Sequence, residues 1–501
     1  MKIRGIAVCM VVVLTVPAFV YASGNGVKAG SSVKYEPNWE SLARYKVPEW
    51  LKDAKYGIFI HWGVYAVPAA GSEWYPRNMY RKEGRQSLYE HHKKNWGDQS
   101  KFGYKDFVPM FKAKKWDPDN WAELFKKAGA KYVVPVAEHH DGFAMYDSSH
   151  TKWDSVEMGP GRDIIGELAK AVRKRGMKFG ASTHYAHNWN YYFFDDGFDT
   201  TNPKYSSLYG KQHPPKVPAS KEFIEHWYAR TVEIVDKYEP DVLYFDFGFR
   251  KPEFEPYRKR IGAYYYNKGL EWGKGVVLNY KGKAFPDGTA VLDIERGKLN
   301  TIRSMVWQTD TSVSKKSWGY IDNDQFKSVD SLVDDLADIV SKNGVLLLNV
   351  GPRADGTIPD EAGDILLGIG RWLEANGEAI YGTRPWHTYG EGPTKVNTGF
   401  GGERKSRAFT ASDIRFTTKN NVLYAICLGW PGKELTIKSL SLRTLISTEG
   451  ISDICLLGAR EKLEWSRDED GLKIKLPAEK PGENAFVFKI MLKGDLIGAI
   501  E

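Results

Sequence analysis

Helical and strand patterns alternate most clearly in two stretches, NWAELFKKAGAKYVVPVAEHH (120–140) and DIIGELAKAVRKRGMKFGASTHYAH (163–187). In each stretch, apolar residues first recur at helical spacing, and a glycine follows at the position of a C-terminal cap. A short run rich in β-branched and aromatic residues comes next. Two such units in succession predict a parallel sheet whose strands are joined by helices.

Working outward, six further apolar runs have the character of buried strands, and helical patterns recur at 221–238 and 331–344. Eight strands with intervening helices predict a (β/α)8-like barrel. The fifth to seventh runs lack clear helices between them, so a doubly wound open sheet is the alternative. No Gly-x-Gly-x-x-Gly turn follows the first strand, and this absence disfavours the open sheet. The predicted strands are 55–63, 131–140, 178–187, 241–248, 275–282, 289–297, 304–313 and 344–352.

The pattern changes toward the C-terminus, where strands follow one another through short turns. A hairpin is predicted in 413–431, turning at Asn420-Asn421, with later strands in 433–440, 471–477 and 485–492. Residues 37–388 are therefore predicted to form the barrel domain and residues 389–501 an all-β sandwich.

The N-terminus has the layout of a secretory signal. Lys2 and Arg4 precede an apolar run, and small residues up to Ala22 suit signal peptidase. We expect a signal peptide over 1–22, a flexible lead-in over 23–36, and a secreted or periplasmic protein. A membrane anchor is the alternative, disfavoured because Pro17 interrupts the run. No other segment is long and apolar enough to predict a membrane span.

Composition and charge exclude several classes of protein. Apolar residues make up 42% and charged residues 27%, which is typical of a globular chain. The net charge of +8 falls to +6 without Lys2 and Arg4, and charges of both signs are interleaved, so no nucleic-acid partner is expected. Cys427 and Cys455 remain after cleavage, either as a disulfide or, as we favour, as free thiols.

Polar and aromatic residues follow the predicted strands at the end where barrel enzymes carry out their chemistry. This mixture of imidazoles, carboxylates and aromatic rings favours a sugar site, because aromatic faces pack on a pyranose while the polar groups bond its hydroxyls. The residues are His61-Trp62, Glu138-His139-His140-Asp141, His184-Tyr185, Asp246 and Glu295.

Asp246 and Glu295 are the candidate pair for glycoside hydrolysis, which takes two carboxyl groups. Asp246 follows the apolar run VLYF, where an ionised carboxylate is costly unless it has partners. Glu295 ends a later strand, although the neighbouring Arg296 leaves a plain ion pair as the alternative. His139 and His140 are adjacent, and adjacent strand residues point to opposite sides, so we favour hydroxyl recognition over a metal site.

Five motifs, occurring in the same order, resemble the α-L-fucosidase family of retaining glycoside hydrolases. The resemblance covers nearly all of the mature chain and is to the bacterial, secreted type of the family. The most specific is LLLNVGPRADGTIPDEAGDILLGIGRWLEANGEAIYGTRPW (346–386). The others are WLKDAKYGIFIHWGVYAVPA (50–69), EWYPRNMY (73–80), EHHDGFAMYDS (138–148) and SWGYI (317–321).

The resemblance implies a (β/α)8-like domain followed by a β-sandwich. It also implies release of terminal α-linked L-fucose from a fucosylated oligosaccharide or glycoconjugate, with retention and with no metal or other cofactor. Asp246 matches the nucleophile, and Glu295 is the best match for the acid/base. Homo-oligomers are common in the family. The residues expected to hold the sugar are His61, Glu73, Trp74, His139, His140, Tyr185, Lys281 and Trp318.

Three positions depart from the family pattern beside the nucleophile. Tyr244 replaces the usual tryptophan, Phe247 replaces a frequent glycine, and Lys281 stands where arginine is common. An α-L-galactosidase or other related-sugar hydrolase on the same fold is therefore an alternative. A non-catalytic fucose-binding protein is a second alternative. It would require the loss of a catalytic carboxylate, and it is disfavoured because both candidate carboxylates, Asp246 and Glu295, are present.

Overall fold

The computed structural model describes residues 34–84 and 86–500. The predicted signal peptide and all but the last three residues of the predicted lead-in lie outside the described residues, so both stay predictions. The barrel and the C-terminal strands belong to one compact unit, residues 35–501. Within the described part of the chain, no helix is both long and apolar enough to cross a bilayer.

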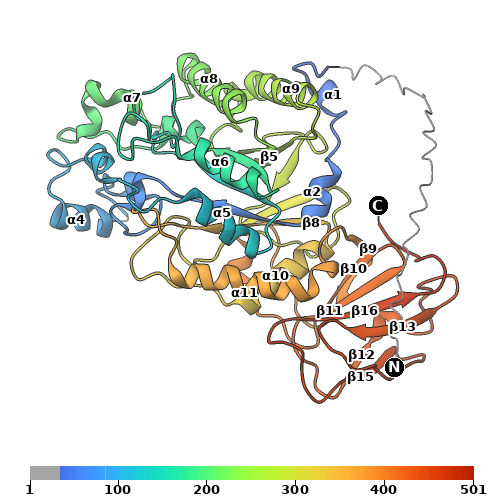
Figure 1. Ribbon diagram of the computed structural model, residues 1–501. Coiled ribbons are helices and arrows are strands. Elements are labelled where there is room, and N and C mark those ends of the chain that lie inside the picture. Colours follow the sequence, from blue (N-terminus) through green and yellow to red (C-terminus); the bar gives the residue numbers. More distant parts are fainter. Residues whose placement is uncertain (1–33, 85, 501) are drawn as a thin grey trace, which may run out of the picture. The chain divides into compact units, whose positions relative to one another are not determined.

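Eight parallel strands close into a barrel, which confirms the predicted fold and excludes the open sheet (Figure 1). The ring closes at β1, where Gly57 lies beside Tyr132 of β2 and beside Leu347 of β8. The strands are buried on both faces, which explains their continuous apolar runs. Their bounds are β1 (Tyr56–Ile60), β2 (Tyr132–Glu138), β3 (Lys178–Thr183), β4 (Val242–Phe245), β5 (Val277–Lys281), β6 (Val291–Asp293), β7 (Trp307–Ser312) and β8 (Gly344–Val350).

The four predicted helices all form: α5 (Pro118–Lys127), α6 (Ile164–Lys174), α8 (Lys221–Tyr238) and α10 (Val329–Ser341). Each begins with a side-chain cap, in which Asp117, Asp163, Ser220 and Ser328 accept a hydrogen bond from the backbone N–H three residues on. The remaining helices are α1 (Trp39–Leu42), α2 (Glu49–Ala54), α3 (Tyr75–Asn78), α4 (Gln86–Asn95), α7 (Ser206–Tyr209), α9 (Glu255–Glu271) and α11 (Asp360–Asn376).

The α9 helix fills the connection from β4 to β5, which the sequence pattern leaves without a helix. Its buried face consists mainly of tyrosines, glycines and Arg258, with Ile261 and Ala263 as its aliphatic residues, so the helical period is weak in the sequence. From β5 to β6 and from β6 to β7 the chain runs through loops.

Two antiparallel sheets form the C-terminal β-sandwich, in the orders β13-β16-β11-β10-β9 and β12-β15-β14. Apolar residues from both sheets, including Phe416, Leu435, Ile474 and Phe488, form one core. The predicted hairpin turns at Asn420, which adopts a left-handed φ of 52°. The strands are β9 (Arg384–Glu391), β10 (Ile414–Lys419), β11 (Val422–Cys427), β12 (Glu434–Ile437), β13 (Ile451–Leu456), β14 (Trp465–Arg467), β15 (Leu472–Lys475) and β16 (Phe486–Leu492).

The first sandwich strand starts earlier than the predicted boundary between 388 and 389. β9 begins at Arg384, and the Trp386 ring is fully buried in the sandwich core. Strand β9 therefore spans the predicted boundary. Cys427 and Cys455 are both free thiols, as we favoured.

A buried ion cluster joins the sandwich to the barrel. Asp338 on α10 lies 2.6 Å from Lys342 and 2.6 Å from Arg415 on β10, and all three are buried. Burial would raise the pKa of Asp338, but the two cations hold it below its ordinary value. The sandwich is therefore anchored to the barrel by paired charges as well as by apolar contact.

Candidate active site

Predicted site residues gather at the carboxyl end of the barrel. His61 follows β1, His140 stands two residues beyond β2, Asp246 follows β4, Lys281 ends β5, and Glu295 comes two residues after β6. Because the strands are parallel, all these ends meet on one face of the barrel.

Asp246 lies at the centre of the group and is buried. Its Oδ2 is 3.2 Å from His140 Nε2 and 3.3 Å from His184 Nδ1, and its Oδ1 is 3.0 Å from Lys281 Nζ. Burial would raise the pKa of this carboxyl, but Lys281 and His184 hold it well below the ordinary range. Asp246 is therefore ionised at neutral pH.

Lys281 connects the two candidate carboxylates. Its Nζ lies 3.0 Å from Asp246 Oδ1, 2.7 Å from Glu295 Oε2 and 3.1 Å from Asp310 Oδ2. The two contacting oxygens of Asp246 and Glu295 are therefore at most 5.7 Å apart, the sum of 3.0 and 2.7 Å. Retaining glycosidases separate their carboxyl groups by about 5–5.5 Å and inverting ones by about 6.5–9.5 Å.

Glu295 is shifted in the opposite direction from Asp246. Burial, together with the charges of Asp310 and Asp246, raises the pKa of Glu295 to about 7, against the lowering effect of Lys281. One carboxyl is thus ionised and the other holds a proton near neutral pH. Two carboxyl groups with pKa values pushed apart are the arrangement that acid/base glycosidases use.

Two buried imidazoles form one wall of the site. His61 Nδ1 donates to Asn349 Oδ1 at 2.7 Å, which leaves Nε2 as an acceptor. Burial lowers the pKa of His61 to about 4 and that of His139 well below its ordinary value, so both rings are neutral. His139 Nδ1 has no hydrogen-bond partner among the described residues. A buried nitrogen in this state fits a substrate hydroxyl.

Glu73 and Trp318 lie in contact although they are distant in sequence. Glu73 Oε2 accepts from Trp318 N at 2.9 Å and from Ser317 Oγ at 3.2 Å. The Trp318 ring lies 5.2 Å from the ring of His61, with the Arg296 guanidinium 4.8 Å from it on one side. Glu73 therefore holds the loop that presents Trp318.

Trp74 lies beside His140, which contacts Asp246. Its ring is 5.2 Å from that of His140 and 5.7 Å from that of His187. It is partly buried, so an edge of the indole stays available for contact.

Tyr185 is the one predicted sugar-holding residue that the structure does not bring into this group. Its ring stacks on Phe223 at 5.3 Å and its hydroxyl lies 3.2 Å from His226 Nδ1, while Arg230 packs on the ring at 4.2 Å. The chain enters a 3-10 turn directly after β3, which directs His184 toward Asp246 and turns Tyr185 outward.

The alternation argument for His139 and His140 does not apply, because β2 ends at Glu138. Their rings lie 4.4 Å apart and both face the site. Nitrogen and oxygen atoms of two groups, His61-His139-His184 and His140-His184-Asp246, lie within 4.8 Å of one another, which is within reach of a metal ion. Lys281 already balances the charge of Asp246 at 3.0 Å, so the donor set favours hydroxyl recognition.

Sequence reasoning missed two residues of the site, Asp310 and Phe400, and it placed His184 at this end of the barrel without predicting its contact with Asp246. Asp310 lies in the middle of β7, bound to Lys281 and to the Tyr244 hydroxyl at 2.9 Å. The tyrosine at position 244 thus supplies a hydroxyl that the family's usual tryptophan lacks. A polar run, TDTS, inside a barrel strand was the available signal for Asp310.

A cavity of about 540 Å³ opens beside the two carboxylates. Asp246, Lys281 and Glu295 line it together with Phe247 and Phe400. Phe400 comes from the segment between β9 and β10 of the sandwich, so the mouth of the site is built from both domains.

Comparisons with known proteins agree with this geometry. The α-L-fucosidase family model matches residues 24–378, and the α-L-fucosidase C-terminal domain model matches residues 407–491. Rat tissue α-L-fucosidase is 32% identical over 91% of this chain and 92% of its own length. Human plasma α-L-fucosidase is 32% identical over 90% of each.

A solved structure is similar over the same range. The crystal structure of Thermotoga maritima α-fucosidase in complex with fucose has a TM-score of 0.74 and 34% identity, covering 91% of this chain and 100% of that one. Together with the barrel, the sandwich and the paired carboxylates, these matches show that the chain belongs to the α-L-fucosidase family of glycoside hydrolases.

Proposed function

We propose that this protein is an exo-acting α-L-fucosidase that cleaves terminal α-linked L-fucose from glycans by a retaining double displacement. The observation that carries the proposal is the Lys281 bridge, which keeps oxygens of Asp246 and Glu295 within 5.7 Å of each other. The family match supports the substrate, and the opposed pKa shifts support the two roles.

In the first step, the ionised Asp246 attacks the anomeric carbon. The bond to the glycosidic oxygen breaks, and Glu295 donates its proton to that oxygen as the leaving group departs. The product is a fucosyl ester of Asp246. In the second step, Glu295 takes a proton from water, which attacks the anomeric carbon and releases Asp246 and fucose.

The charge state of Asp246 determines when Glu295 changes from acid to base. While Asp246 is ionised, its negative charge helps to raise the pKa of Glu295. Ester formation removes that charge, so the pKa of Glu295 falls while Lys281 still faces it at 2.7 Å. Glu295 then ionises more readily and accepts the proton of the attacking water.

Sugar recognition falls to the neutral imidazoles and the two indoles. His61 and His139 offer ring nitrogens to hydroxyl groups, and Trp74 and Trp318 offer apolar surface to the ring and its methyl group. This set requires no metal or other cofactor. An L-galactoside differs by one hydroxyl, so its hydrolysis tests how closely the pocket fits the methyl group of fucose.

Export to the periplasm or the exterior is part of the proposal, supported by the N-terminal sequence. The mature protein then begins at Ser23. N-terminal sequencing of protein recovered from its native compartment tests this; a chain that still begins at Met1 would contradict it.

Hydrolysis of 4-nitrophenyl α-L-fucoside by the wild type, Asp246→Ala and Glu295→Ala tests both roles. We expect both variants to be crippled, with azide rescuing Asp246→Ala to a β-fucosyl azide and Glu295→Ala to an α-fucosyl azide. Full activity of Glu295→Ala would overturn its assignment. A wild type that binds fucose without turnover would favour a binding protein, and a faster reaction with the matching L-galactoside would change the substrate.

A further inference from the structure

One segment of the sandwich domain returns to the barrel and pairs with the catalytic turn. This crossing segment is residues 397–406, between β9 and β10. Gly401 N donates to the Glu295 carbonyl at 2.9 Å, and Gly399 N donates to the Lys298 carbonyl at 2.9 Å. Both glycines adopt left-handed φ angles, of 68° and 80°, which allow this tight course.

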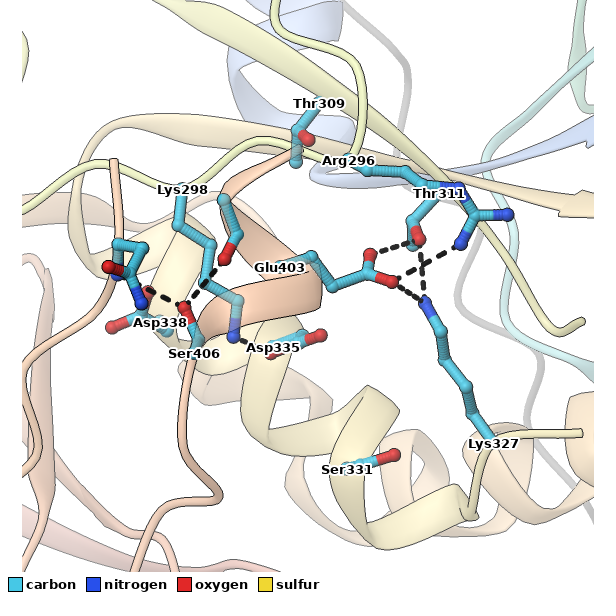
Figure 2. Close-up of polar contacts among 12 residues, drawn as sticks. Arg296, Lys298, Thr309, Thr311, Lys327, Ser331, Asp335, Asp338, Glu403 and Ser406 are labelled. Atoms are coloured by element: carbon cyan, nitrogen blue, oxygen red, sulfur yellow. Dashed lines mark hydrogen bonds and ion pairs between the residues drawn. The ribbon is translucent and has the colours of Figure 1, made fainter. Parts of the chain in front are cut away.

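A largely buried ion cluster around Glu403 fixes the crossing segment in place (Figure 2). The Glu403 carboxylate accepts from Thr311 Oγ1, lies 2.5 Å from Lys327 Nζ, and accepts from Arg296 Nη1 at 3.2 Å. Burial would raise the pKa of Glu403, but Lys327 and Arg296 hold it below its ordinary value. The segment is therefore held by charged partners on the barrel.

The anchored segment presents Phe400 at the mouth of the catalytic cavity. Phe400 is 69% exposed, an unusual state for a large apolar ring on a segment held this firmly. Its ring lies 6.3 Å from that of Phe247, at 61°, and both line the cavity that contains Asp246 and Glu295. Phe247 directly follows the nucleophile in sequence.

The chemistry dictates which part of the substrate meets these rings. Glu295 protonates the oxygen that departs with the leaving group, so the leaving group lies on the Glu295 side of the bond. Glu295 and its neighbours Asp293 and Ile294 line the cavity of about 540 Å³, which Asp246 also borders. A larger hollow of about 950 Å³ adjoins His187, but neither Asp246 nor Glu295 lines it.

We propose that Phe400 and Phe247 form an aromatic platform for the leaving-group sugar, the pyranose to which fucose is attached. A pyranose ring presents an apolar face of C–H groups, which packs on aromatic faces. The sandwich domain thereby contributes to the choice of glycan through one side chain. This inference rests on the proposed function, since the orientation of the leaving group follows from the role of Glu295.

The test compares a substrate that has a leaving-group sugar with one that has none. The first substrate is the disaccharide that the wild type cleaves best, chosen from a panel with α1,2-, α1,3-, α1,4- and α1,6-linked fucose. The second is α-L-fucosyl fluoride, whose leaving group is a single atom. We expect Phe400→Ala to lower the ratio of kcat/KM, disaccharide over fluoride, by about tenfold, and Phe400→Trp to keep it within about twofold.

Leu445→Ala is the matched control, because Leu445 is also 69% exposed and lies on the sandwich domain outside the cavity lining. It should keep the wild-type ratio, and thermal unfolding confirms that each variant is folded. An unchanged ratio in Phe400→Ala, or a wild type that cleaves the fluoride but no disaccharide, would overturn the platform while leaving the fucosidase function intact. A wild type inactive on both substrate types would instead remove the proposed function.

Discussion

Lys281 Nζ lies 2.7 Å from Glu295 Oε2, so the carboxyl group that we propose as acid/base titrates beside a fixed cation. Without that cation, burial and two neighbouring carboxylates would raise the pKa of Glu295 further above its value of about 7. The same ammonium holds the pKa of Asp246 down. The working pH range of the enzyme therefore depends on one side chain.

Activity requires ionised Asp246 and protonated Glu295, so kcat/KM of the wild type should fall above pH about 7 as Glu295 loses its proton. Lys281→Met removes a charge that lowers both pKa values, so both limbs of the pH profile should move to higher pH, by about 1–3 units each.

Lys281→Arg is the control for this shift, because the guanidinium keeps the charge. Its limbs should stay near those of the wild type. A Lys281→Met enzyme whose pH profile coincides with the wild-type profile would show that Lys281 does not tune the pair. The measurement is kcat/KM for 4-nitrophenyl α-L-fucoside from pH 3 to pH 10.

Asp338→Ala should destabilise the protein by about 3–5 kcal/mol, because it leaves Lys342 and Arg415 buried without their counter-charge. The pKa of Asp338 is lowered on folding, so its stabilisation is present above the ordinary value of 3.8 and is lost as the pH falls below it. The urea midpoint, followed by tryptophan fluorescence at pH 7, measures the loss.

A control for Asp338→Ala is Glu483→Ala, which removes an exposed pair with Lys480 and should leave the urea midpoint nearly unchanged. Equal midpoints for the two variants would contradict the view that the Asp338 cluster anchors the sandwich to the barrel.

Glu403→Gln should lower kcat/KM for 4-nitrophenyl α-L-fucoside by about ten- to a hundredfold, because small displacements at a catalytic group are costly. Arg296 directly follows Glu295 in the sequence and adopts a strained left-handed φ of 44°. Glu403 is the ion-pair partner of Arg296, so its replacement should let the turn that carries Glu295 move.

Glu469→Gln, which removes an exposed pair with Arg443, is the matched control and should behave like the wild type. Glu403→Asp keeps the charge and should recover part of the lost kcat/KM. Wild-type activity in a folded Glu403→Gln enzyme would mean that the crossing segment does not position Glu295.

Dialysis against EDTA should leave kcat/KM unchanged, because Lys281 already provides the positive charge beside Asp246. Assays before and after dialysis, with and without added Zn²⁺, make the measurement. Activity lost to EDTA and restored by Zn²⁺ would assign the His61-His139-His184 group to a metal instead.

The barrel, and the meeting of Asp246 and Glu295 at one of its faces, could be predicted because the signals are local. Each strand is a short apolar run. Asp246 directly follows one of these strands and Glu295 comes two residues after another, so topology alone carries them to one face. The eight strands and four of the longer helices follow from the same periodicity.

The contacts of His184, Asp310 and Phe400 do not follow from that logic. Whether His184 or Tyr185 faces the site depends on the backbone turn after β3, which periodicity does not determine. Asp310 lies in a polar strand that gives no sign of its inward direction. Phe400 is brought to the cavity by a long-range backbone pairing between Gly401 and Glu295, and no local pattern marks such a pairing.

The most direct test of the account is the configuration of the first sugar released. Hydrolysis of 4-nitrophenyl α-L-fucoside followed by ¹H NMR resolves the α and β anomers before they equilibrate. Oxygens of Asp246 and Glu295 that lie within 5.7 Å predict retention, so α-L-fucose should appear first. If β-L-fucose appears first, the reaction inverts, and the double displacement through Asp246 is wrong.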